Sequence, residues 1–305
     1  MKAKLDFANI VVKLVLLTGS HMKIESFYHQ DTQTFCHLLY DEVSQKAAII
    51  DPVLDYKANS GKIGHEFSDT VIERVKTLNL TLHYILETHV HADHLSAAQY
   101  IKQLIGGQVY IGSQVSKVQQ HFDDVFNLNS LQESLFDHLI EPNNSLMLGD
   151  IVITAISTPG HTPACMSYVV TRPNDVTHVF VGDTLFMPDI GTARCDFPGG
   201  DAHSLYQSVQ TLYALGDETL LHMCHDYPPE QRGVRSVVTV KEQRESNIHC
   251  ADGITEAQFI KIRQGRDLGL DAPRLILPSL QVNIRAGFLP EADEKGRRFL
   301  KIPLR

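Results

Sequence analysis

The chain has 305 residues, of which 43% are hydrophobic and 21% charged, and its formal net charge is −9 at pH 7. These values exclude a disordered or fibrous chain and fit one large α/β domain or two small ones. The acidic balance argues against nucleic acid as a partner. The sequence also lacks an apolar run of about eighteen residues, the length that a membrane-spanning helix requires.

The first residues, MKAKLDFANIVVKLVLLTGSH, superficially resemble a signal peptide, because basic residues precede an apolar run. Lys13 interrupts that run, no small-residue cleavage site follows, and the sequence GSH before Met22 is typical of a cloning scar. We therefore expect residues 1–21 to be a tag or leader outside the fold, and residues 22–305 to form one domain. Without the leader the chain has 24 basic and 35 acidic side chains, a net charge of −11.

Five cysteines are scattered along the chain and never form a CxxC pair: Cys36, Cys165, Cys195, Cys224 and Cys250. An odd number at irregular spacing is compatible with a reducing compartment, so we expect a cytoplasmic protein with buried free thiols. Cys195 is the exception to follow, because it lies in a glycine-rich segment near the candidate site.

Strand-like and helical patterns alternate from the start of the expected domain. Short apolar runs separated by a polar turn predict a strand hairpin, and apolar residues at helical spacing behind a Ser/Asp start predict a helix. In chain order, we expect strands over Thr34–Tyr40 and Lys46–Asp51, a helix over Ser68–Asn79 and a strand over Leu82–Glu87.

The next stretch, ETHVHADHLSAA from Glu87 to Ala98, concentrates histidine and aspartate. We expect His89 and His91 in a loop after the strand, and Asp93 and His94 at the start of a helix, where an acidic residue suits the helix dipole. The buried face of that helix is predicted to be Ala97, Ala98, Ile101, Leu104 and Ile105.

Further strands and helices follow in both halves of the chain, which favours two packed sheets flanked by helices. The predicted strands are Gln108–Ile111, Ile151–Ile156, Cys165–Val170, Thr177–Val181 and Leu220–Met223, and the predicted helices are Ala202–Leu215 and Glu256–Leu268.

Potential metal ligands recur where four separate strands end. The HxH pair of His89 and His91 alone is as readily a chance feature of a solvated loop. His161 in TPGHT, Asp183 in GDT and His225 in CHD follow three further strands, and a rigid sheet aims such side chains at one point. The sequence therefore predicts a metal site. Eight other histidines match no motif: His65, His83, His121, His138, His178, His203, His222 and His249.

These motifs, THVHADH, PGHT, GDTLF and CHD in this order over residues 34–230, resemble those of the metallo-β-lactamase superfamily. The resemblance implies an α/β fold, an αββα sandwich of two mixed β-sheets flanked by helices, with metal at the edge between the sheets. All seven ligand positions of the superfamily are filled, so the sequence permits two metals. They are His89, His91, Asp93, His94, His161, Asp183 and His225.

The form THxHADH with GTARCDFPGGD at Gly191–Asp201 resembles the persulfide dioxygenases more specifically. That resemblance implies one Fe(II) per chain, held by His89, His161 and Asp183, with glutathione persulfide and O2 as substrates. The residues His91, Asp93, His94 and His225 would then orient ligands and shape the pocket.

Glutathione is acidic, so its carboxylates need cationic or hydrogen-bonding partners. Candidates are Arg194, Tyr227, Arg232 and Arg235, for which a solvated face or a structural ion pair is the alternative. Asp196 either fixes Arg194 or is a turn residue, and Pro198-Gly199-Gly200 predicts a tight turn.

Two other functions stay open. Glyoxalase II, a thiolester hydrolase, shares the ligand types and a glutathione-derived substrate, but it usually carries a helical C-terminal region, whereas Leu275–Ile284 here is predicted to be extended. A non-catalytic persulfide or metal sensor would need a partner-binding region or a reactive cysteine pair, neither of which is evident. The C-terminal stretch Asn247–Arg305 either completes the sandwich or forms a homodimer contact.

Overall fold

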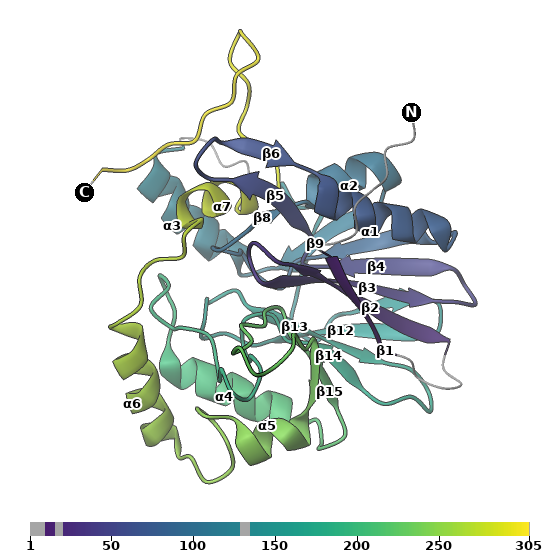
Figure 1. The fold of residues 1–305 in the computed structure, drawn as a ribbon, viewed down its shortest axis with the longest axis vertical. Helices are drawn as coiled ribbons and strands as arrows, with labels where there is room; N and C mark the ends of the chain where they lie inside the picture. The colour runs from purple at the N-terminus through teal and green to yellow at the C-terminus, as the bar shows by residue number, and fades with distance from the viewer. Residues whose placement is uncertain (1–9, 16–20, 129–134, 305) are drawn as a thin grey trace.

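The computed structural model describes residues 10–15, 21–128 and 135–304. Two β-sheets pack face to face, and helices cover the outer face of each sheet (Figure 1). This arrangement confirms the predicted αββα sandwich. Of the helices in the described ranges, none is both long enough and apolar enough to cross a bilayer.

The first sheet has seven strands, antiparallel at one edge and parallel at the other. In spatial order they are β1 (Ile10–Val15), β2 (Met22–His29), β3 (Thr34–Asp41), β4 (Lys46–Ile50), β7 (Thr81–Leu86), β9 (Gln108–Gly112) and β10 (His138–Ile140).

The second sheet has six strands and is antiparallel except for one parallel pair, β14 with β15. Its strands are β11 (Ser145–Leu148), β12 (Ile151–Ser157), β13 (Met166–Thr171), β14 (His178–Phe180), β15 (Leu220–His222) and β16 (Val237–Thr239). A small third sheet contains β6 (Lys62–Gly64), β5 (Val53–Lys57) and β8 (Leu95–Ser96).

Seven helices of the described chain flank the sheets. Residues of α1 (Glu66–Thr77), α2 (Ala98–Ile105), α3 (Val115–Phe126) and α7 (Ile276–Asn283) join the core on the first sheet. Residues of α4 (Ala202–Tyr213), α5 (Val240–Ser246) and α6 (Glu256–Asp267) join the core on the second.

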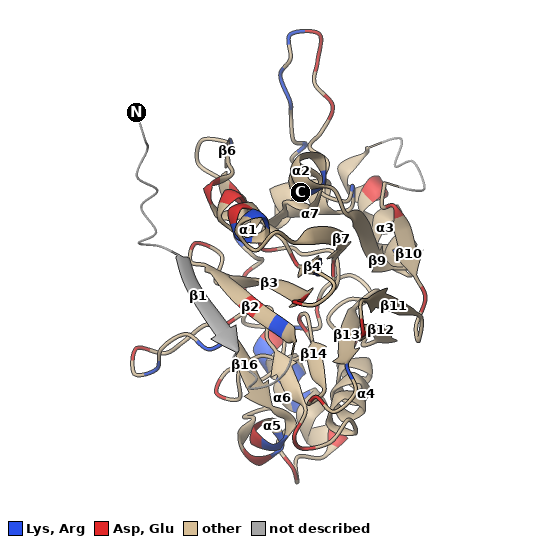
Figure 2. Cartoon of the chain, turned by 90° about the vertical axis from the view of Figure 1, so that its right-hand side faces the viewer, with Lys and Arg blue, Asp and Glu red and all other residues tan. Residues whose placement is uncertain are grey.

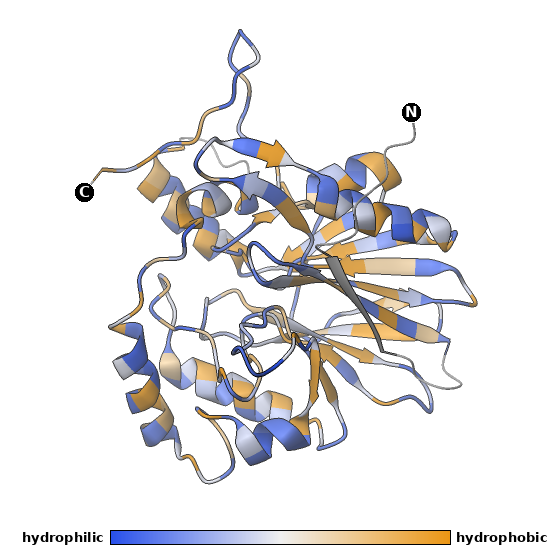
Figure 3. Cartoon of the chain, viewed as in Figure 1, coloured by the Kyte–Doolittle hydropathy of each residue, from blue (hydrophilic) through white to orange (hydrophobic). Residues whose placement is uncertain are grey.

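Strand alternation explains why each sheet is buried on both faces. Leu38 belongs to the core under the helices, whereas its neighbour Leu39 belongs to the core between the sheets, together with Tyr168 and Phe180. Hydrophobic residues follow the strands of both sheets (Figure 3). Charged residues of both signs lie mainly on helices and loops, for example on α1 and α5 (Figure 2).

Three expectations from the sequence are wrong. Residues 10–15, which we set aside with the leader, form β1 and extend the first sheet against β2. Leu275–Ile284 is not extended, because α7 occupies Ile276–Asn283. Helix α2 begins only at Ala98, after the short strand β8, so Asp93 and His94 lie in the loop before it, and Leu104 is 52% exposed.

Candidate metal centre

The predicted ligands lie in the loops that follow strands β7, β12, β14 and β15. Strand β7 belongs to the first sheet and the other three to the second. Within the second sheet, β12 and β14 are both antiparallel to β13, and β15 is parallel to β14. The carboxyl ends of these three strands therefore share one edge, where their loops meet the loop from β7.

Two glycines allow these loops to approach one another. Gly160 has φ +137°, and a Cβ there would lie 2.4 Å from the backbone of Leu205 in α4. Gly182 has φ +53°, and its Cβ would lie 2.7 Å from Oγ1 of Thr88. Because only glycine tolerates such contacts and dihedrals, His161 and Asp183 are brought against the loop that carries His89.

His89, His161 and Asp183 form one buried group whose ligand atoms all lie within 4.8 Å of one another. Oδ2 of Asp183 lies 3.8 Å from Nε2 of His89 and 3.8 Å from Nε2 of His161. These separations are too long for hydrogen bonds, and they leave room for an ion between the three side chains.

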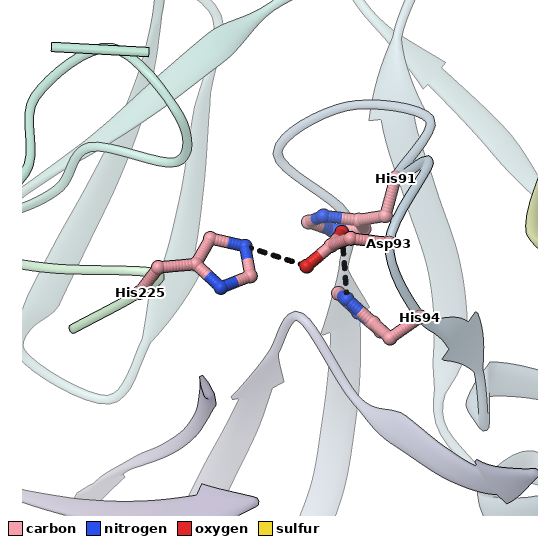
Figure 4. Close-up of side chains that lie close together, drawn as sticks. All are labelled: His91, Asp93, His94 and His225. Carbon is pink, nitrogen blue, oxygen red and sulfur yellow. Dashed lines mark hydrogen bonds and ion pairs between the residues drawn. The ribbon is translucent and has the colours of Figure 1, made fainter. Parts of the chain in front are cut away.

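A second group contains His91, Asp93, His94 and His225, again within 4.8 Å (Figure 4). Asp93 lies at its centre, with one carboxylate oxygen 3.2 Å from Nδ1 of His94 and the other 3.2 Å from Nε2 of His225. Asp183 reaches this group too, because its Oδ1 lies 3.4 Å from Nε2 of His225. The two groups are therefore adjacent, and Asp183 of the first group lies next to His225 of the second.

Hydrogen bonds fix which nitrogen of each ring carries the proton. Nδ1 of His161 donates to the carbonyl of Arg194 at 2.8 Å, and Nδ1 of His225 faces the carbonyl of Gln33 at 3.2 Å. The Thr88 hydroxyl donates to Asp51, so it accepts from Nδ1 of His89. In each ring Nε2 then carries the free electron pair that a metal needs.

Several potential ligand atoms are buried but have no hydrogen-bond partner in the described structure. They are Nε2 of His89, His94 and His225, Nδ1 of His91 and Oδ1 of Asp183. Buried polar atoms are rarely left unpaired. Burial, with His91 and His161 nearby, also holds the pKa of His89 well below its usual value, so that ring is neutral and able to bind a metal. The residues present fit a metal site.

His91 is held differently, by two acidic residues that the sequence motifs did not single out. Its Nε2 lies 3.0 Å from Oδ1 of Asp51 and 3.5 Å from Glu87. Burial alone would lower the pKa of His91, but Asp51 and Glu87 outweigh it and raise the pKa well above its usual value. Asp51 directly follows strand β4, but a single aspartate after a strand forms no motif, so nothing in the local sequence marks it as part of the site.

A cleft of about 430 Å³ opens beside the first group. His161 and Asp183 line it, whereas the second group contributes only Asp93. Three cations that were not predicted also line it: Arg263, Arg266 and Arg274. Arg263 is paired with Asp267, but the side chains of Arg266 and Arg274 have no hydrogen-bond or ion-pair partner among the described residues.

Two of the four predicted substrate-binding residues line this cleft, and two do not. Arg194 and Tyr227 are part of its wall. Arg232 forms bidentate pairs with Asp226 and Asp189, and Arg235 pairs with Glu242. Carboxylates of the chain thus occupy both guanidinium groups, and neither residue lines the cleft.

Tyr227 packs its ring parallel to that of His225, with centroids 5.6 Å apart. Burial and the nearby Asp93 and Asp183 raise the pKa of Tyr227 well above its usual value, so the phenol stays protonated and can donate a hydrogen bond. Cys195 is buried, and burial raises its pKa to about 12, which disfavours a reactive thiolate. All five cysteines are free and buried.

Comparison with known proteins agrees with this geometry. The family model for the metallo-beta-lactamase superfamily matches residues 30–225. A probable metallo-hydrolase of Burkholderia pseudomallei is 48% identical, over 93% of this chain and 99% of the relative. Glyoxylase B2 of Dictyostelium discoideum is 44% identical over 92% and 97%, and the human mitochondrial persulfide dioxygenase ETHE1 is 29% identical over 88% and 91%.

Among solved structures, ETHE1 from Myxococcus xanthus superposes with a TM-score of 0.68 at 28% identity, covering 91% of this chain and 100% of that one. The family model spans more than half of the chain, and its matched region contains every predicted ligand. The chain therefore belongs to the metallo-beta-lactamase superfamily and is an enzyme with the His and Asp metal-binding site of that superfamily.

Proposed function

We propose that the chain is a persulfide dioxygenase that uses one Fe(II), held by His89, His161 and Asp183. The observation that carries the proposal is the position of the cleft. His161 and Asp183 line it, whereas His91, His94 and His225 are completely buried. A metal that binds two external substrates must face open space, and the first group does so.

Two histidines and one carboxylate are the ligand set of non-haem iron oxygenases, which leave coordination positions open. When bound there, Fe(II) would supply the redox chemistry that joins a persulfide to dioxygen. The overall reaction balances as GSSH + O2 + H2O giving GSH and H2SO3. The terminal sulfur loses four electrons, the two atoms of dioxygen take them up, and water supplies the third oxygen of sulfite.

The cleft supplies partners for the two carboxylates of glutathione. Arg266 and Arg274 are exposed and have no partner among the described residues, so substrate carboxylates would not have to displace an existing ion pair. Tyr227 adds a hydrogen-bond donor close to Asp183. We infer that the two guanidinium groups hold the peptide while its sulfur end reaches His161 and Asp183.

The residues of the second group then have a supporting role. Asp93 accepts from His94 and lies against His225, which keeps both rings in place, and the ring of His225 lies beside Asp183. Thr88 orients His89, and the Arg194 carbonyl orients His161. Such partners of the ligands typically change metal affinity or activity by about 10 to 100-fold when they are removed.

A glyoxalase-like hydrolase of hydroxyacylglutathione is the alternative, with two metals and Asp183 between them. Three findings favour it: the second group also has unpaired buried nitrogens, Leu275–Ile284 is helical and not extended, and glyoxylase B2 is 44% identical to this chain. A metal pair would ionise a bridging water for hydrolysis. Both functions use a glutathione-derived substrate, so the cleft residues serve either one.

The deciding experiment is dioxygen uptake by iron-loaded protein on addition of glutathione persulfide, with heat-killed protein as the blank and sulfite measured in parallel. We expect uptake with one sulfite formed per dioxygen consumed. Absence of uptake by protein that contains one iron per chain, together with hydrolysis of S-lactoylglutathione, would establish the hydrolase instead.

A further inference from the structure

Asn283, the last residue of α7, makes three hydrogen bonds to the backbone of the metal-binding loop, residues 88–96. Its Nδ2 donates to the carbonyls of His91 and His94, both at 2.8 Å. Its Oδ1 accepts from the N–H of Ser96, also at 2.8 Å. A carboxamide can form about four hydrogen bonds, so most of its capacity is directed at this one loop.

The loop has few other backbone partners. Within the described ranges, residues 89–94 form no hydrogen bond with another backbone group. His91 and His94 are fully buried, so water does not replace the missing partners. A buried carbonyl without a partner costs roughly as much as a lost hydrogen bond. The side chain of Asn283 therefore supplies hydrogen bonds that no backbone group provides.

The end of α7 is itself fixed in place, so Asn283 is presented rigidly. Gln119 of α3 donates to the carbonyl of Ile284 at 2.8 Å, and Gln99 of α2 donates to the carbonyl of Ala286 at 3.2 Å. Gly287 has φ +87°, and a Cβ there would lie 3.1 Å from the carbonyl of Ser96. Three neighbouring elements thus hold this turn against the loop.

Asp51 holds the same loop from the opposite end. It accepts from the backbone N–H and the hydroxyl of Thr88, and it contacts Nε2 of His91. Asp51 lies within the region that the family model matches, whereas Asn283 lies well beyond residue 225, where that match ends. The C-terminal segment therefore contributes to the metal centre although it contains none of its ligands.

We infer that Asn283 is a positioning residue that holds the loop 88–96 in its metal-binding shape. The inference rests on the metal centre of the proposed function, but not on the reaction performed there. It gives α7 a role that the sequence left open, since the C-terminal stretch was expected either to complete the sandwich or to form a dimer contact.

The same helix offers a matched control, Gln281. Its carboxamide is equally buried and also makes three hydrogen bonds to backbone groups, namely the carbonyls of Leu277 and Lys301 and the N–H of Lys301. These bonds hold the C-terminal tail and not the metal loop. Gln281→Ala therefore removes similar bonds and a similar volume without touching the loop.

The test is the rate at which Fe(II)-loaded protein releases iron to a coloured chelator under anaerobic conditions, with thermal unfolding of the metal-free protein measured alongside. We expect Asn283→Ala to release iron about 10 to 100-fold faster than the wild type, and Gln281→Ala to release it at the wild-type rate. Both variants should lower the unfolding temperature of the metal-free protein.

Asn283→Asp is the second variant, because it keeps the side-chain volume and the acceptor for Ser96 but turns an oxygen toward the two carbonyls. It should also release iron faster, and it serves if Asn283→Ala does not fold. Wild-type iron release from both Asn283 variants, or equal acceleration in Gln281→Ala, would overturn the inference. Either result stands whether or not the wild type consumes dioxygen.

Discussion

The imidazole of His161 and the backbone of Arg194 are joined by a hydrogen bond of 2.8 Å from Nδ1 to the carbonyl oxygen. The side chain of Arg194 has a different role, because its guanidinium forms a bidentate pair with Asp196 and donates to the carbonyls of Leu270 and Asp271. One residue thus orients a metal ligand through its backbone and secures the segment after α6, a wall of the cleft, through its side chain.

Separation of these two roles leads to the first prediction. Arg194→Ala keeps the backbone carbonyl, so the protein should bind iron normally, while the segment after α6 loses its charged hydrogen bonds. Such bonds contribute about 1.5–3 kcal/mol each, and we expect KM for glutathione persulfide to rise by about 10-fold or more. Iron content by metal analysis and steady-state oxygen uptake would check this. Loss of iron from the variant would contradict it.

The second prediction concerns the number of metals. Asp183→Asn or His161→Ala should abolish iron binding and activity together, because only two ligands would remain in the first group. His94→Ala should reduce activity but keep the iron. Metal analysis after gel filtration distinguishes these outcomes. If His94→Ala loses half of a two-metal content, the hydrolase alternative gains and the single-iron assignment fails.

The third prediction addresses the unpaired cations of the cleft. Arg266→Ala and Arg274→Ala should each raise KM by about 10-fold, since a charged hydrogen bond to a substrate carboxylate is lost, and kcat should change little. Arg235→Ala is the matched control, because Arg235 is paired with Glu242 and does not line the cleft. If Arg266→Ala and Arg274→Ala have the same KM for glutathione persulfide as Arg235→Ala, glutathione binds elsewhere.

The fourth prediction is a loss of stability in acid. Burial lowers the pKa of His37 and of His178 from 6.5 to about 4. Both are neutral in the folded protein, whereas the unfolded chain takes up protons below pH 6.5. The contribution of each histidine to the free energy of unfolding should therefore be largest above about pH 6.5. It should decrease as the pH drops toward 4, by on the order of 3 kcal/mol per histidine.

Urea unfolding of the metal-free protein at pH 7.5 and pH 5 measures this fall. His178→Gln removes one of the buried histidines whose pKa is lowered, so the free energy of unfolding of the variant should depend less steeply on pH over that range. Burial is the cause of the low pKa of His37, whose ring nitrogens are hydrogen-bonded to Ser26 and to the carbonyl of Met223. An unchanged slope in the variant would refute the assignment for His178.

Much of the fold could be predicted because its strands are short, apolar and bounded by turns. The predicted strand Lys46–Asp51 differs from β4 by one residue, and the helix predicted over Ala202–Leu215 contains α4. Helix α7 was missed because ILPSLQVN is rich in apolar and β-branched residues and contains Pro278. Proline is tolerated there because it lies in the first turn, where its missing N–H has no helical partner.

The candidate ligands could be predicted because metal chemistry restricts residue types, and loops after strands meet at one edge. The residues that support them could not. Asp51 and Asn283 have ordinary local sequences, and their roles depend on contacts between distant parts of the chain, such as that of Asn283 with Ser96 across a sequence separation of 187. The surroundings of Arg232 could not be predicted for a related reason, because proximity to His225 in sequence says nothing about the carboxylates around its side chain.

That long separation has a consequence for the order in which the protein matures. During synthesis at about 5–20 residues per second, the loop 88–96 leaves the ribosome roughly 10–40 s before Asn283 does. All predicted ligands, up to His225, precede α7 in the chain. A nascent chain thus contains all the metal-binding side chains before α7, which completes their support, has been synthesised. We therefore expect tight retention of the metal only once the whole chain has folded.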